Sequence, residues 1–216
     1  MVVLRVVFSA AFTMVALMLF ASLLTSNPYM RMSKGLYASH DLIEYDHDYV
    51  ARQLIDYLNY RHDDLEFGAN AEDDSVLMRD IEIRHMVDVR DVYTLLRGIA
   101  LVSLLFVVSV SIILFKVNKR AFYDTYRNIF WLPLGFLVFV GTWFLIDFGR
   151  IFTWFHLLLF DNDDWILRSD DVLIMLLPSN FWMVSGIIIL VGTAMMIGLA
   201  IVLNEKFMKP QIRKNT

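Results

Sequence analysis

Two histidines are the candidates for acid–base chemistry in this sequence, and the first is His85. On a helix, Glu82, His85 and Asp88 would share roughly one face, because residues three apart are neighbours there. A carboxylate beside an imidazole can fix its tautomer and stabilise its cation. The spacing fits a charged helix surface with pairs three residues apart equally well, so both interpretations stay open.

The second candidate, His156, is the only titratable residue between Arg150 and Asp161, and it lies in the apolar run Ile151–Phe160. A buried imidazole loses hydration and needs a hydrogen-bond partner. It is either a structural residue bonded to a backbone carbonyl, or a general acid or base at a membrane surface, where ionisable groups are costly and often functional. The other histidines have polar neighbours, and we expect them to be exposed to solvent: His40, His47 and His62.

No further catalytic motif accompanies these histidines. The absence of Cys excludes disulfides, thiolate metal sites and a cysteine nucleophile, and the chain has no GxSxG, HExxH, P-loop or GxGxxG motif. Zinc held by His85, His156 and an Asp is an alternative, because imidazole and carboxylate suit that metal. Neither histidine has a second one close by in sequence, so we expect no metal and no cofactor.

The composition indicates which kind of element must hold these residues. Of the 216 residues, 58% are hydrophobic and 19% are charged, and the mean hydropathy is +0.56. Soluble domains carry about 45–50% apolar and about 25% charged residues, so an ordinary soluble globule is excluded, as is a disordered chain. The sequence has no basic patch that would indicate nucleic-acid binding. We therefore predict an integral membrane protein.

Four apolar stretches reach the length of about 20 residues that a membrane-spanning helix needs. We predict transmembrane helices at residues 1–26, 97–116, 129–147 and 181–204, a cap at 27–96, a second outer loop at 148–180, and inner segments at 117–128 and 205–216. The first apolar run has about twenty residues, against roughly 7–15 in a cleavable signal peptide, so we expect a retained anchor.

Basic residues set the expected orientation, since cytoplasmic loops are enriched in Lys and Arg. With both termini in the cytoplasm, the inner segments hold nine basic and two acidic residues, and the outer segments hold ten basic and twenty-one acidic ones. Both termini are therefore predicted to be cytoplasmic, which places His85 and His156 on the extracytoplasmic side.

The outer segments are each too short for an independent core, and we expect them to form a small extracytoplasmic α+β cap on a four-helix transmembrane bundle. An amphipathic helix is predicted at His47–Tyr60, with Val50, Leu54 and Leu58 on one face, and a few short strands are expected beside it. The stretch Ile151–Phe160 is too short to span and is predicted to be interfacial or re-entrant. The predicted fold class is a mainly α, polytopic membrane protein.

Two motifs resemble one known family. Glu82-x-x-His85-Met86-x-Asp88-Val89-Arg90 precedes the second predicted span, and a second motif follows the third span: Phe155-His156-x-x-x-Phe160, Trp165, Asp171-x-Leu173-Ile174, Pro178 and Phe181. In this order, with four spans and two outer segments, the chain resembles the lipoprotein intramolecular transacylase (Lit) family of Gram-positive bacteria over nearly its whole length. Trp182 stands where a second Phe is expected. The resemblance implies an acyltransferase of the bacterial cell membrane.

The resemblance also implies a substrate. Lit-like enzymes act on a lipoprotein whose N-terminal cysteine carries an S-diacylglyceryl group and a free α-amine. They move the sn-2 acyl chain onto that amine and give the lyso form, so the expected partners are this lipoprotein and membrane lipids. Both reacting groups belong to one molecule, and a large effective molarity makes an acyl-enzyme unnecessary.

This reaction needs proton transfer and charge stabilisation. An imidazole can take and return a proton under mild conditions, so we expect His85 to be the principal base and proton shuttle. His156 is expected to be a second acid or base, or a donor to the oxyanion; the spacing does not decide between these roles. Orienting or oxyanion roles are expected for four charged residues: Glu82, Asp88, Arg90 and Asp171.

Two other functions fit the sequence. A lipid hydrolase or an intermolecular acyltransferase at the outer leaflet could use the same histidine pair, and it would release free fatty acid or transfer a chain between molecules. A non-enzymatic membrane assembly or binding subunit would need neither histidine.

Overall fold

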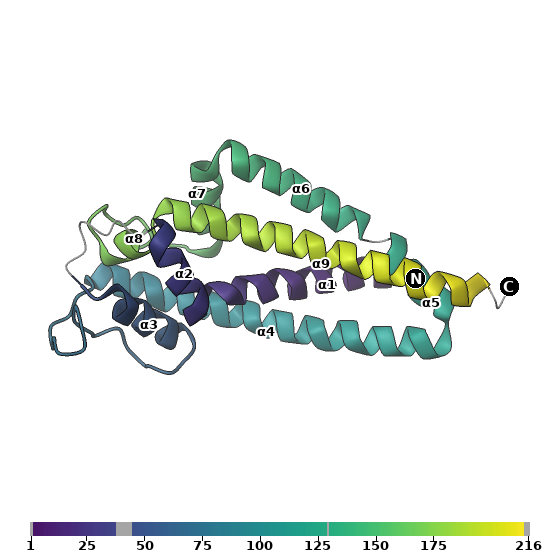
Figure 1. The fold of residues 1–216 in the computed structure, drawn as a ribbon, viewed down its shortest axis with the longest axis horizontal. Helices are drawn as coiled ribbons and strands as arrows, with labels where there is room; N and C mark the ends of the chain where they lie inside the picture. The colour runs from purple at the N-terminus through teal and green to yellow at the C-terminus, as the bar shows by residue number, and fades with distance from the viewer. Residues whose placement is uncertain (1, 38–44, 129, 214–216) are drawn as a thin grey trace. The chain divides into compact units, whose positions relative to one another are not determined.

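The computed structural model describes residues 2–37, 45–128 and 130–213. These residues are mostly helical: α1 (Val2–Leu24), α2 (Asn27–Tyr37), α3 (His47–Leu58), α4 (Asp80–Val117), α5 (Lys119–Asn128), α6 (Trp131–Ile146), α7 (Phe148–Leu159), α8 (Val172–Leu176) and α9 (Ser179–Arg213) (Figure 1). The chain forms two compact units. The bundle unit comprises Met1–Phe20, Leu96–Asp147 and Ile187–Thr216, and the histidine unit comprises Ala21–Leu95 and Phe148–Gly186.

The bundle unit is held together by side chains from four helices. Phe8 of α1, Val107 of α4, Leu137 of α6 and Ile197 of α9 are buried in one apolar cluster with Phe130. Helices α1, α6 and α9 are apolar on all sides rather than along one stripe, a pattern typical of helices whose outer surface contacts lipid. Four helices therefore share one core in this unit.

Three helices, α1, α4 and α9, are long and apolar enough to cross a membrane, and the bent pair Pro133–Ile146 and Phe148–Leu159 makes a fourth candidate if it is counted as one span. In α4 the uncharged run is Gly98–Phe115, and the charged first part of the helix, Asp80–Arg97, lies outside it. Within that run Leu101, Val102 and Leu105 are each more than half exposed, at 58%, 68% and 60%. Such a surface needs an apolar surrounding, because exposed apolar area is unfavourable in water.

The histidine unit has a core to which separate segments contribute. The amphipathic helix predicted at His47–Tyr60 is confirmed as α3, and the side chain of Asp46 caps its first turn. The core combines α3 with the loop after it, the first turns of α4, α8 and the start of α9: Val50, Leu54, Leu65, Met86, Val172, Leu176 and Phe181. The two segments that were each too short for a core therefore build one together.

The α+β cap predicted from the sequence is wrong, because the described residues contain no strand. Between α3 and α4, side chains hold the backbone instead: Asp73 accepts hydrogen bonds from the N–H groups of Ala69 and Ser75. Backbone bonds across this segment are isolated, such as the one from the Leu77 N–H to the Phe67 carbonyl at 2.9 Å. Local side-chain bonds compete with a strand ladder, and this acidic segment forms turns.

Candidate active site

Glu82 fixes the first turn of α4. Its Oε2 accepts a hydrogen bond of 3.0 Å from the backbone N–H of Arg79, the residue before the helix, and this capping-box contact satisfies a donor that the helix leaves free. Its Oε1 accepts a hydrogen bond of 2.9 Å from the N–H of Leu173 in α8. The Glu82 side chain is fully buried. One carboxylate thus ties the start of α4 to α8 and sets the position of His85, one turn later.

A second buried carboxylate, Asp171, strengthens the same junction. It accepts two hydrogen bonds of 2.6 Å from the guanidinium of Arg79 and one of 2.7 Å from the N–H of Arg168. Bidentate, charge-assisted bonds of this kind are stronger than neutral ones. Burial raises the pKa of Glu82, and the N–H groups of Leu173 and Arg79 oppose that rise.

His85 of α4 and His156 of α7 lie next to each other in this unit. Their ring centres are 5.9 Å apart and their planes are inclined by 33°. The ring of Phe160 lies against both, 5.3 Å from His85 and 5.7 Å from His156 between centres. The histidines are only 8% and 7% exposed. The structure therefore brings together the two residues that the sequence singled out.

One hydrogen bond fixes the tautomer of His156. Its Nδ1 lies 2.7 Å from the carbonyl oxygen of Phe152, one turn earlier in α7. A carbonyl oxygen only accepts, so Nδ1 carries the hydrogen and the lone pair of the neutral ring is on Nε2. The rings of Phe152 and Trp165 lie against the imidazole, with centres 4.2 and 4.9 Å away. The structural hydrogen bond and a chemical role for Nε2 are therefore compatible.

His85 is electrostatically a weak base. Burial, and to a lesser extent the nearby His156, lower its pKa from 6.5 to about 4, against the opposing charges of Asp88 and Asp164. The imidazole is therefore neutral at neutral pH. Its Nδ1 is buried and has no hydrogen-bond partner among the residues that the structure describes. A neutral ring of this kind can accept a proton from a group that enters the site.

The loop between α7 and α8 is tied to α4 on both sides of His85. Arg84 donates two hydrogen bonds, of 2.9 and 3.0 Å, to the carboxylate of Asp164. Asn162 donates one of 2.8 Å to Asp88. These two anchors flank His85 in α4, so they hold the loop at the histidine pair.

The supporting residues predicted from the sequence form no hydrogen bond with either imidazole in the described part of the chain: Glu82, Asp88, Arg90 and Asp171. Asp88 acts on His85 through its charge. Arg90 places its guanidinium 4.0 Å from the ring centre of Tyr57 and 5.0 Å from that of Tyr60, which is a cation–π contact. Their roles in catalysis stay predictions.

The remaining histidines divide into three cases. His47 is 5% exposed rather than open to solvent, because it begins α3, whose apolar face packs on the core. The His62 side chain is 50% exposed, as expected. His40 lies outside the described residues.

Two residues of the site received no role from the sequence. Arg79 pairs with Asp171 from 92 positions away, a separation at which residue spacing carries no signal. Trp165 belongs to the second family motif, and it is also a large aromatic residue directly after the acidic run Asp161–Asp164.

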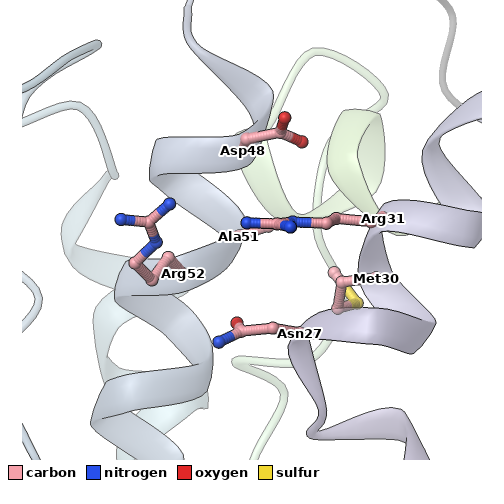
Figure 2. Close-up of a pocket in the computed structure, with 6 residues that line it drawn as sticks. All are labelled: Asn27, Met30, Arg31, Asp48, Ala51 and Arg52. Carbon is pink, nitrogen blue, oxygen red and sulfur yellow. The ribbon is translucent and has the colours of Figure 1, made fainter.

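Other parts of the described chain are less suited to the chemistry. A pocket between α2 and α3 is lined by Asn27, Met30, Arg31, Asp48, Ala51 and Arg52 (Figure 2). Its volume of about 10 Å³ matches about one water molecule, so it is a polar contact between two helices. Among the described residues, no three His, Asp or Glu side chains are grouped so that they could hold a metal ion.

Comparison with known proteins shows which family and which solved structures this chain resembles. A family model described as lipoprotein intramolecular transacylase Lit matches residues 2–182. A structure of the membrane-integral lipoprotein intramolecular transacylase Lit from Bacillus cereus is 21% identical, with a TM-score of 0.80, and the match covers 98% of this chain and 97% of that one.

Two further structures of the Bacillus cereus protein carry a histidine-to-alanine or a histidine-to-arginine substitution. They are 21% and 22% identical to this chain, with TM-scores of 0.76 and 0.70. These matches cover 98% and 99% of this chain and 94% and 92% of the other. No curated protein sequence gives a significant match. The structural likeness shows a shared fold.

Proposed function

Because the chain belongs to the lipoprotein intramolecular transacylase (Lit) family and is therefore an acyltransferase, we propose that it moves the sn-2 acyl chain of an S-diacylglyceryl-cysteine onto the α-amine of the same lipoprotein. The product is the N-acyl, S-monoacylglyceryl (lyso) form. The observation that carries this proposal is the buried pair of His85 and His156, whose ring centres are 5.9 Å apart.

The reaction replaces an ester by an amide within one substrate molecule. The amine nitrogen forms a bond to the ester carbonyl carbon, and the carbonyl oxygen becomes an oxyanion. The nitrogen then loses a proton, the bond from carbon to the glycerol oxygen breaks, and that oxygen takes up a proton. Because both groups are held together, orientation supplies a large effective molarity, and no acyl-enzyme intermediate is needed.

His85 accepts and returns this proton. The free α-amine has a pKa of about 8, but its nitrogen becomes much more acidic once its lone pair is bonded to carbon. An imidazole with a pKa of about 4 can accept that proton, and its cation is a strong acid toward the departing glycerol oxygen. His156, with its lone pair on Nε2, is the second acid or base of the pair.

The acyl chains lie against the apolar surface of α7. This helix buries His156 and exposes Phe155, Leu157 and Leu158 by 53%, 60% and 82%. The lysines and arginines of the sequence favour cytoplasmic termini, and the histidine unit is then extracytoplasmic, where a lipid-anchored protein would present its modified cysteine.

The test is expression of the full chain in a bacterium that cannot N-acylate its lipoproteins, followed by tandem mass spectrometry of N-terminal lipopeptides. The wild-type chain should convert S-diacylglyceryl peptides with a free amine to the N-acyl, S-monoacylglyceryl form. His85→Ala and His156→Ala should leave the substrate unchanged at equal membrane levels. His62→Ala alters an exposed histidine and is the matched control, with wild-type conversion expected.

The same experiment separates the rival functions. Release of free fatty acid without an N-acylated peptide would identify a lipid hydrolase. Acyl chains labelled in a second lipid that then appear on the amine would identify intermolecular transfer. Either result contradicts the proposed reaction.

A further inference from the structure

We propose that Trp165 is a further catalytic residue, whose indole N–H donates a hydrogen bond to the oxyanion that forms at the sn-2 carbonyl. This inference rests on the proposed transacylation and adds a third side chain to the two histidines. It is carried by a buried donor without a partner beside His156.

The indole Nε1 of Trp165 is buried and has no hydrogen-bond partner among the described residues. An indole N–H can only donate, and a buried donor that stays unpaired lowers stability. Native proteins pair nearly all such groups, so each one left over needs an explanation. The substrate carbonyl oxygen, which becomes an oxyanion during the reaction, would be the acceptor for this N–H.

Trp165 is placed so that its N–H could donate to the oxygen on the reacting carbonyl carbon. Its ring centre is 4.9 Å from that of His156, with the planes inclined by 30°, so the indole stacks along one face of the imidazole. His156 is in turn 5.9 Å from His85 between ring centres. A carbonyl held at the histidine pair would therefore lie beside the indole ring.

The surrounding loop holds the indole in place. The residue before Trp165, Asp164, is bound by Arg84 of α4 through two hydrogen bonds. The residue after it, Ile166, donates its N–H to the carbonyl of Asp163 at 3.0 Å. An oxyanion donor is effective when it is positioned before the charge forms, and Trp165 has an anchor on each side.

Two other side chains near the pair already use their donors. The Nδ1–H of His156 bonds to a backbone carbonyl, and the Nε2 of the neutral ring carries no hydrogen. The guanidinium of Arg84 is bound to a carboxylate. Besides the ring N–H of neutral His85, the Trp165 N–H is a side-chain donor beside the pair that has no partner among the described residues.

The test removes this one N–H from the full-length enzyme. Replacing Trp165 with benzothienylalanine keeps the bicyclic ring but puts sulfur in place of the N–H, and Trp165→Phe removes the same donor genetically. With a synthetic S-diacylglyceryl lipopeptide, we expect kcat to fall about 100-fold, the effect of losing one oxyanion donor, and KM to stay within about threefold. The same sulfur replacement at Trp131, 66% exposed in the bundle unit, should leave kcat unchanged.

Binding provides a second readout that needs no turnover. A lipopeptide with a phosphonate in place of the sn-2 ester mimics the oxyanion, and it should bind the sulfur variant more weakly by about the factor lost in kcat. Unchanged kcat and unchanged phosphonate affinity in that variant would overturn the assignment of Trp165 while leaving the transacylase intact. If the wild-type enzyme forms no N-acyl product, the proposed function fails, and this inference fails with it.

Discussion

The imidazoles of His85 and His156 come from different helices and lie 5.9 Å apart between ring centres, with Phe160 against both. A positive charge on one ring opposes protonation of the other, which contributes to the lowered pKa of His85. Near neutral pH the pair can therefore accept one proton. The proposed transfer of a proton from the amine nitrogen to the glycerol oxygen requires such a pair.

The low pKa of His85 predicts the pH–rate profile. Because His85 stays neutral down to about pH 4, the substrate α-amine, with a pKa of about 8, controls kcat/KM above that pH. We expect log kcat/KM of the purified enzyme to rise with unit slope between about pH 5 and 7. A second inflection near 6.5, the ordinary pKa of histidine, would contradict the role given to a buried His85.

Burial of neutral His85 also makes stability depend on pH. The folded pKa of about 4 lies below the value of 6.5 in the unfolded chain, so this contribution is fully present above pH 6.5 and is lost as the pH falls toward 4, by up to about 3 kcal/mol. Between pH 6.5 and 4.5, Tm should fall further for wild type than for His85→Gln. Equal decreases in the two proteins would refute the expectation.

The main effect of Glu82→Ala should be a loss of folding stability rather than a direct effect on catalysis. The substitution leaves the N–H groups of Arg79 and Leu173 without their acceptor, and we expect a loss of about 2–4 kcal/mol in the free energy of unfolding. Glu66→Ala, at an exposed position, is the control and should change stability by less than about 0.5 kcal/mol. A Glu82→Ala protein with wild-type Tm but no activity would instead support the orienting role predicted from the sequence.

The neighbouring carboxylates Asp170 and Asp171 should respond very differently to the same change. The Asp171 side chain is 2% exposed and accepts charge-assisted hydrogen bonds from Arg79, so Asp171→Asn weakens these bonds at a buried acceptor and should cost about 1–3 kcal/mol. The Asp170 side chain is 62% exposed and paired with Arg168, so Asp170→Asn should cost less than about 1 kcal/mol. Thermal unfolding of both variants checks this, and equal losses would rule out the junction described at the start of α4.

The sequence predicted what depends on local pattern. The apolar neighbours of His156 predicted its burial, and the spacing of Val50 and Leu54 predicted the face of α3 that packs on the core. The family motifs brought His85 and His156 into one hypothesis, and the structure places them side by side.

Contacts between distant segments could not be predicted in this way. Three-residue spacing put Glu82 and Asp88 beside His85, but Glu82 bonds to the backbone 91 positions away and Asp88 to a side chain 74 positions away. Helical periodicity says which residues share a face and not which partner that face meets. The expected strands failed for a related reason, since side chains such as Asp73 satisfied the backbone locally.

The histidine pair is tested most directly by a double-mutant cycle on the rate of N-acyl lipopeptide formation. The rate is measured for wild type, His85→Gln, His156→Gln and the double variant at matched amounts of folded enzyme. If the two imidazoles relay one proton as a unit, each single change should lower kcat about 10²–10⁴-fold, and the double variant should be little slower than the slower single variant. Losses that multiply, or a single variant that keeps the wild-type rate, would contradict the account.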